Sequence, residues 1–368
     1  MSWLSVWVEG WGESRALAAG GLLIGLAFGF FAQRSRFCLR SAVIEFARNV
    51  TGGRLTVWLF AFASAVLGTQ ALAALGWFDA SNARQIASRG SLSGAAVGGA
   101  LFGVGMILAR GCSSRLLVLA AQGNLRSLLS GLVFAVTAQA SWTGLLSPLR
   151  ETIAQWWTVD GGAARDLLAR TGLGHGGALV FGALWLAAAI FWARRQRVGV
   201  WGWAGAIGVG LSVAAAWWFT WAVMQVAFDP HPIQSLSFTG PSAEVLNRVL
   251  FAGDKPLTFD LGLVPGVFLG AFVAAWAFGE LKLEGFMGGA SMRRYIAGAM
   301  LMGFGGMTAG GCAVGAGISG AAIFTITSWV TLSAMWLAAA VTDRLLDQPP
   351  EAATQALPAV ADRHPLPR

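Results

Sequence analysis

The sequence predicts an all-α protein that crosses a membrane many times. Hydrophobic residues fill 56% of its 368 positions and charged residues only 11%, whereas soluble chains carry roughly 25% charged residues. Fifty glycines and eighteen tryptophans accompany this hydrophobicity, and these residues pack membrane helices closely and anchor them at the lipid headgroups. The third observation is a series of apolar segments, each near the roughly 20 residues that cross a bilayer. These features exclude a water-soluble enzyme.

About nine apolar segments are expected to cross the membrane as helices. They lie at residues 16–33, 56–76, 93–109, 126–146, 177–193, 199–226, 262–279, 295–309 and 320–342. Two polar stretches, Arg150 to His175 and Asp229 to Asp260, are expected to lie at the membrane surface or to fold partly back into it. Residues 1–345 are therefore treated as one transmembrane transport domain. Residues 346–368, rich in proline and alanine, are expected to form a disordered cytoplasmic tail.

The arginines indicate the orientation. They follow the first, the fifth and the last apolar segments, at Arg34, Arg36, Arg40, Arg48 and Arg54, at Arg194, Arg195 and Arg197, and at Arg344. Because basic residues are retained in cytoplasmic loops, the N-terminus is expected outside and the C-terminus in the cytoplasm. The net charge of +8 does not indicate nucleic acid, because the basic residues are scattered between apolar runs. The first apolar run lacks a small-residue cleavage site, so we expect no signal peptide.

Two glycine-rich segments, at residues 98–112 and 298–312, indicate an internal duplication. Without a gap they share Gly98/Gly298, Leu101/Leu301, Gly103/Gly303, Gly105/Gly305, Ala109/Ala309, Gly111/Gly311 and Cys112/Cys312. We expect two pseudo-symmetric halves, an inverted repeat, at about 16–146 and 199–343. Many secondary transporters have this layout, with interrupted helices that line a cavity.

Each Gly-Cys pair marks the end of an apolar helix. Gly111 and Gly311 allow the chain to turn, and a short half-helix beginning near Ser113 would then present free N–H groups to an anion. The alternative is a plain kink, in which the glycines serve only helix packing.

The three cysteines, Cys38, Cys112 and Cys312, each lie beside glycine or arginine at a helix end. The arginines around Cys38 would favour its thiolate and attract an anion; alternatively they only set the orientation. Arg110 lies at the end of an apolar stretch, where an arginine implies a water-filled path, a partner or a substrate, unless its side chain reaches the interface. Buried cysteines also serve as small apolar residues. We expect no disulfide framework, no metal site and no cofactor, and the ATP-binding pattern GxxxxGK[ST] is absent from the sequence.

Three motifs, RSRFCLR, GxGMxxARGCSS and GGMTAGGCAVGAG, resemble the YeeE/YedE family of bacterial inner-membrane sulfur-compound transporters. Together with the paired halves, the resemblance covers about residues 16–343. It implies an hourglass-shaped protein with re-entrant half-helices, in which three cysteines pass thiosulfate on by S–H hydrogen bonds without covalent capture. By resemblance, Cys38, Cys112 and Cys312 take these roles. From their positions beside the cysteines, we expect Arg36 and Arg110 to assist. The resemblance also implies a separate cytoplasmic sulfur-carrier protein as a possible partner.

The duplication adds four expected pore-lining positions. An offset of 200 residues places the counterpart of Phe37-Cys38 at Ser237-Phe238, so the second half lacks this thiol. We therefore include Ser237, Phe238, Thr239 and Gly240; the alternative is an ordinary surface turn.

The leading functional hypothesis is uptake of thiosulfate, or of a closely related sulfur anion, by a non-enzymatic transporter in the lipid bilayer. Transport of another sulfur or selenium species, or export, is the first alternative. A membrane sulfurtransferase or thiol oxidoreductase is the second, because cysteines of low pKa are nucleophiles.

Overall fold

The computed structural model describes residues 2–50, 52–229, 231–251, 256–286 and 288–346, and most of this part of the chain is helical. The α-helices are α1 (Ser2–Trp11), α2 (Glu13–Ser35), α3 (Leu39–Ala47), α4 (Gly53–Ala74), α5 (Arg84–Ala87), α6 (Leu92–Leu108), α7 (Ser113–Ala121), α8 (Leu125–Trp142), α9 (Ser147–Gln155), α10 (Leu167–Thr171), α11 (Gly174–Gln196), α12 (Val200–Met224), α13 (Thr239–Phe251), α14 (Phe259–Ala277), α15 (Gly289–Thr308) and α16 (Ile326–Leu346). A 3-10 helix, η1 (Gly162–Ala164), and a π-helix, η2 (Gly315–Gly320), complete them. The strands β1 (Gly90–Ser91) and β2 (Thr158–Val159) pair antiparallel.

The predicted all-α polytopic membrane fold is confirmed. The nine predicted apolar segments coincide with or overlap α2, α4, α6, α8, α11, α12, α14, α15 and α16. Within the described residues, six helical spans are both long and apolar enough to cross a membrane: Glu13–Ala47, Gly53–Ala74, Leu92–Ala121, Gly174–Gln196, Val200–Met224 and Phe259–Ala277. The bent pair of α8 and α9, with 66° between its members, raises this number to seven. Helices α15 and α16 have 20 and 21 residues but are not among these spans.

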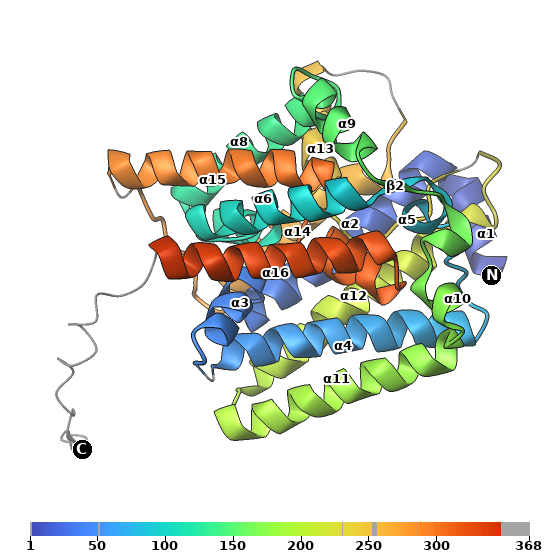
Figure 1. The fold of residues 1–368 in the computed structure, drawn as a ribbon. Coiled ribbons are helices and arrows are strands. Elements are labelled where there is room, and N and C mark those ends of the chain that lie inside the picture. Colours follow the sequence, from blue (N-terminus) through green and yellow to red (C-terminus); the bar gives the residue numbers. More distant parts are fainter. Residues whose placement is uncertain (1, 51, 230, 252–255, 287, 347–368) are drawn as a thin grey trace.

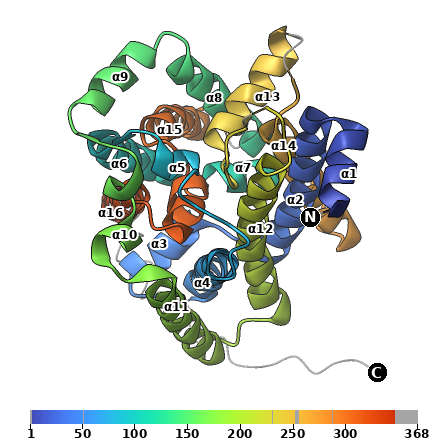
Figure 2. The same ribbon diagram turned by 90° about the vertical axis from the view of Figure 1, so that its right-hand side faces the viewer.

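The helices form one bundle whose long members run side by side. In Figure 1, α1 and the end of α16 lie at opposite ends of the bundle. Figure 2 looks along several of the long helices and shows α6, α15 and α16 as neighbours, with α4 and α11 at one edge. Of the predicted tail, Leu346 is the last residue of α16, and the remainder lies outside the described residues.

The packing of the two halves follows the predicted inverted repeat. Helix α2 packs on α14 as α4 packs on α12, and α6 packs on α16 as α8 packs on α15. At the centre α6 and α15 cross in opposite directions, with Gly98 against Ala309 and Gly298 against Ala109. Exchanging the two halves therefore turns each of these contacts into the other.

These central glycines let the two backbones touch. A Cβ atom at Gly298 would lie 2.5 Å from the amide nitrogen of Ala109 and 2.7 Å from the carbonyl oxygen of Gly105. We expect Gly298→Val to lower the free energy of unfolding by about 1–3 kcal/mol, the usual range for overpacking, measured by SDS-induced unfolding in micelles. Gly131→Val on α8 is the matched control, because a Cβ atom there meets nothing within 4 Å. Equal stability of the two variants would contradict the close crossing.

The two predicted polar stretches fold back onto the bundle. The stretch from Asp229 to Asp260 contains α13, whose Thr239, Pro241 and Ala243 are buried and which packs on α8, α14 and α15. The stretch from Arg150 to His175 contains β2, η1 and α10, and it contacts the start of α16 through the hydrogen bond from the Ile326 amide to the Arg165 carbonyl (2.9 Å). Both stretches thereby pack against long helices of the bundle.

Candidate functional site

In the first half of the chain, the helical path is interrupted between α6 and α7. Arg110 has a φ of 56°, in the left-handed region that residues other than glycine rarely adopt. Gly111 follows, and Cys112 is the N-cap residue of α7. The Cys112 side chain is fully buried, with its sulfur 3.5 Å from the hydroxyl of Ser114. The turn therefore places a thiol at the start of a half-helix, inside the protein.

In the second half, the helical path is interrupted at the equivalent position, between α15 and η2. Gly310, the counterpart of Arg110, has a φ of 76°, and fully buried Cys312 lies just before η2. The amides of Phe238 and Gly315 donate hydrogen bonds to the Cys312 sulfur at 3.3 and 3.4 Å. Because these amides occupy the sulfur as an acceptor, the S–H group is left as a donor.

Cys38 joins Cys112 in a pair of thiols. It is the N-cap residue of α3 and 7% exposed, and its thiol lies close enough to that of Cys112 for the two to interact. The guanidinium group of Arg115, on α7, acts on both sulfurs through its charge. The Arg115 Nη1 atom is buried and has no hydrogen-bond partner among the described residues. The pair thus has a positive charge beside it.

Phe238 occupies in the second half the place that Cys38 occupies in the first. Cys38 precedes α3 and contacts Cys112, and Phe238 precedes α13 and contacts Cys312 through its amide. The second half therefore has a backbone N–H group where the first half has a thiol. Four of the predicted residues, Cys38 with Cys112 and Phe238 with Cys312, form two equivalent contacts.

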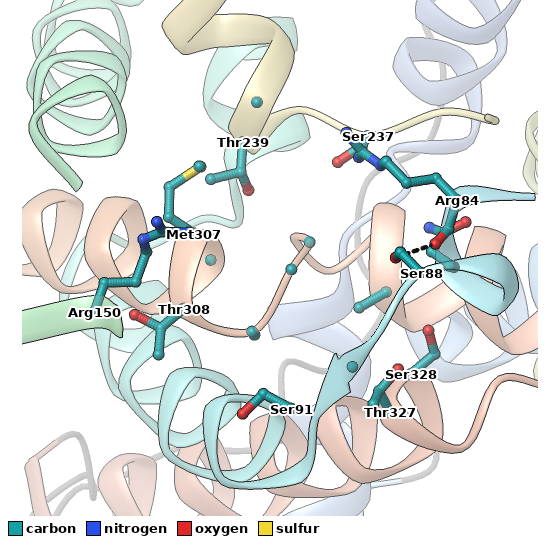
Figure 3. Close-up of a pocket in the computed structure, with 18 of the residues that line it drawn as sticks. Arg84, Ser88, Ser91, Arg150, Ser237, Thr239, Met307, Thr308, Thr327 and Ser328 are labelled. Carbon is teal, nitrogen blue, oxygen red and sulfur yellow. Dashed lines mark hydrogen bonds between the residues drawn. The ribbon is translucent and has the colours of Figure 1, made fainter. Parts of the chain in front are cut away.

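A cavity of about 340 Å³, which we call the arginine cavity, opens beside the second of these contacts. Four predicted residues line it: Ser237, Thr239, Gly240 and Gly311. Figure 3 shows Arg84 and Arg150 on opposite sides of this cavity, with Thr239 and Ser237 along its edge. The Thr239 side chain is 1% exposed, and its hydroxyl has no hydrogen-bond partner among the described residues.

The lining of the arginine cavity has more positive than negative side chains, and two of its arginines, Arg89 and Arg150, pair with Asp160 and Glu151 outside the lining. Its lining includes four arginines, Arg84, Arg89, Arg150 and Arg165, and its one carboxylate among the described residues is Asp260. A concave surface with charge of one sign concentrates ions of the opposite sign. The cavity is therefore suited to a small anion.

Arg165 is held in the wall of the arginine cavity by its neighbours. Its guanidinium donates to the carbonyl oxygen of Ser88 (2.7 Å) and to the hydroxyl of Thr327 (2.8 Å). Burial lowers the pKa of Arg165 to about 10, so the group stays charged at neutral pH. It joins the segment after β2 to α16 and adds positive charge to the wall.

The remaining predicted residues lie outside the arginine cavity. Arg36 is 57% exposed and forms a 3.9 Å ion pair with Glu280, and Arg110 is exposed. Ser113 is buried, its hydroxyl has no partner among the described residues, and it lines a separate, mostly apolar cavity of about 240 Å³ between α7, α8, α13 and α14. Gly111 lies in the turn before Cys112. The roles of these residues stay predictions.

The cavity arginines Arg84, Arg150 and Arg165, and the carboxylate of Asp260, were missing from the predicted site. Arg84 and Asp260 lie at the starts of α5 and α14, Arg150 lies within the short helix α9, and Arg165 lies in a connecting segment. For Arg150, Arg165 and Asp260 the one signal in the sequence was the polar character of the two long stretches, and Arg84 lies in neither stretch. No group of three or more His, Cys, Asp or Glu side chains that could hold a metal ion occurs among the described residues.

The fold and the site define a class: a polytopic helical membrane protein with buried thiols beside an anion-attracting cavity. The chain belongs to the sulphur transport family, whose model matches residues 34–341. This finding confirms the resemblance to the YeeE/YedE family.

Two relatives extend this assignment over most of the chain, and both are named thiosulfate transporter TsuA. The protein of Escherichia coli K12 is 25% identical over 367 residues, which cover 88% of this chain and 92% of that protein. The protein of Spirochaeta thermophila is 28% identical over 322 residues, which cover 84% of this chain and 93% of that protein. The chain is thus similar to these transporters along nearly their whole length.

Proposed function

We propose that this protein takes up thiosulfate, or a closely related sulfur anion, across the bacterial inner membrane. The path begins in the arginine cavity and passes the three buried thiols. The observation that carries the proposal is the Cys312 thiol, whose sulfur accepts two backbone N–H groups while the adjoining Gly311 lines the arginine cavity. The names of the two relatives support thiosulfate as the substrate.

The arginine cavity serves as the entrance. It lies at the same end of the bundle as the start of α2. Its lining residue Asp260 is the second residue of α14, and α14 runs parallel to α2 with Gly262 against Ala18 and Gly270 against Leu26. If the N-terminus faces outward, as the arginines after the first span predict, the cavity opens to the outside. Its positive charge then raises the local concentration of a dianion.

The thiols serve as weak, exchangeable hydrogen-bond donors. A thiol is a poor donor, and conduction requires binding that is weak enough for the ion to leave each site. Cys312 receives the anion from the arginine cavity, and the Cys112 and Cys38 pair receives it farther along, beside the charge of Arg115. A cytoplasmic sulfur carrier, if one participates, is a separate chain that accepts the anion at the end where Arg36 and Glu280 lie.

Uptake of labelled thiosulfate into proteoliposomes tests the proposal, with protein-free liposomes as the baseline and sulfate as a competitor. Sulfate has the same charge but lacks the terminal sulfur, so a path that recognises sulfur should discriminate against it. We expect saturable uptake that excess sulfate inhibits at least about tenfold more weakly than unlabelled thiosulfate does, which corresponds to about 1.4 kcal/mol of discrimination. Equal inhibition by the two anions would contradict recognition by the thiols.

A further inference from the structure

A single carboxylate lies in the wall of the arginine cavity. Asp260 is the second residue of α14 and is half-buried. It shares the lining with four arginines and with Thr239, whose buried hydroxyl has no partner among the described residues. A carboxylate in this place repels the dianion that the surrounding arginines attract, so its presence calls for a role.

The surroundings of Asp260 hold one of its oxygens and leave the other available. The Gln234 side-chain amide donates to Oδ1 of Asp260 at 3.0 Å. The backbone of Gln234 is held by Thr220, because the Gln234 backbone N–H donates to the Thr220 hydroxyl (3.2 Å) and that hydroxyl donates to the Gln234 backbone carbonyl (2.7 Å). Among the described residues, the hydrogen bond from Gln234 thus occupies Oδ1 alone, and Oδ2 can carry a proton without loss of this bond.

The charged groups around Asp260 come from several elements. Arg84 of α5 and Glu244 of α13 act on it through their charges, in opposite directions. Glu244 accepts a hydrogen bond from Thr258 (2.8 Å). Three helices pack against α14 and carry further ionisable groups. Helix α13 carries Arg248, which donates to the Pro256 carbonyl, and α7 carries Arg115 beside the thiols. Helix α2 carries Arg15, Arg34 and Glu13, and Glu13 pairs with His231. Asp260 is therefore the carboxyl that meets an anion entering the cavity.

We propose that Asp260 takes up a proton when the substrate dianion occupies the arginine cavity. This inference rests on the proposed function and adds a proton to its binding step. The proton comes from the water at the cavity mouth and joins Oδ2, while Oδ1 continues to accept from Gln234. Protonation removes the repulsion between the carboxylate and the dianion, and by linkage the anion and the proton each favour binding of the other.

The consequence for transport is a dependence on outside acidity. When the dianion binds in the arginine cavity, the proton that Asp260 takes up offsets one of the two added negative charges. Occupancy of the arginine cavity by the anion therefore rises as the outside pH falls. The membrane potential, negative inside, opposes entry of negative charge, and a proton bound with the anion reduces the net charge at the entrance.

Isothermal titration calorimetry of the purified full-length protein with thiosulfate tests the proposal, in two buffers of different ionisation enthalpy at one pH. The difference in apparent enthalpy reports protons taken up on binding. At a pH at which Asp260 is ionised before the anion binds, we expect about one proton per thiosulfate for the wild type, and an affinity that improves by up to about tenfold for each unit by which the pH falls. Asp260→Asn should bind thiosulfate with no proton uptake and with an affinity that does not change with pH.

Two further variants control this experiment. Asp160→Asn removes an exposed carboxylate that pairs with Arg89 at 3.7 Å, and it should keep the proton uptake of the wild type. Asp260→Glu retains a carboxyl group and should restore proton uptake. Binding by the wild type without proton uptake overturns the proposal even if Asp260→Asn fails to assemble, and so does proton uptake by Asp260→Asn. Absence of thiosulfate binding to the wild type contradicts the proposed function as well.

Discussion

Arg48→Leu is expected to lower the free energy of unfolding by about 3–5 kcal/mol, because it leaves a buried carboxylate without its partner. Asp343, on α16, is fully buried. The Arg48 guanidinium donates to both of its oxygens, from Nε at 2.7 Å and from Nη2 at 2.9 Å. Such bidentate pairs are among the stronger charged contacts in proteins. SDS-induced unfolding in micelles measures the loss.

The neighbouring arginine provides the control for this stability prediction. Arg344 is exposed and donates one hydrogen bond to the Ala47 carbonyl (3.1 Å), so Arg344→Leu should cost less than about 1 kcal/mol. The double variant Arg48→Leu/Asp343→Leu should recover much of the loss, since no buried charge then remains unpaired. If Arg48→Leu unfolds like the wild type, the pair does not hold α3 against α16.

This ion pair also bears on the site, because Arg48 is the C-cap residue of α3 and Cys38 is its N-cap residue. Helix α3 has only nine residues, and so short a helix depends on its contacts with the remainder of the protein. The Arg48–Asp343 pair therefore fixes the half-helix that presents Cys38.

Cys112→Ala is expected to reduce the initial rate of thiosulfate uptake by about 10- to 100-fold. The substitution removes the donor that would hold the anion between Cys312 and Cys38, and a hydrogen bond to a charged group contributes about 1.5–3 kcal/mol. Cys112→Ser keeps a donor in the same place and should retain an intermediate rate. Uptake is measured in proteoliposomes at matched protein content.

Ser64→Ala is the control for the effect of a small substitution in a membrane helix. The Ser64 hydroxyl bonds to the Phe60 carbonyl of its own helix at 2.7 Å, away from the thiols and the arginine cavity. Its uptake should match that of the wild type. Undiminished uptake by Cys112→Ala would remove this thiol from the path.

Much of the fold could be predicted because the membrane imposes simple rules on the sequence. The length and hydrophobicity of each apolar segment were enough to locate the nine long helices. The shared Gly-Cys positions revealed the duplication, and the 200-residue offset led to Phe238, which the structure places before α13 as Cys38 stands before α3. These features depend on local composition and on comparison of the chain with itself.

The lining of the arginine cavity could not be predicted, because it depends on contacts between distant segments. Arg165 reaches the cavity through pairing of β2 with β1 and through its bond to Thr327, 162 residues away. Arg150 lies on the short helix α9, and Asp260 faces Gln234 from the start of α14. Helical periodicity contains no information on how such connecting segments fold back. Their polarity indicated only that they leave the lipid.

The thiol beside the arginine cavity provides the most direct test of the account. Initial rates of thiosulfate uptake should be measured for the wild type and for Cys312→Ala, reconstituted at equal protein content and compared with protein-free liposomes. The account predicts clear uptake by the wild type and a rate near the protein-free baseline for Cys312→Ala. Equal uptake by the two proteins would contradict it.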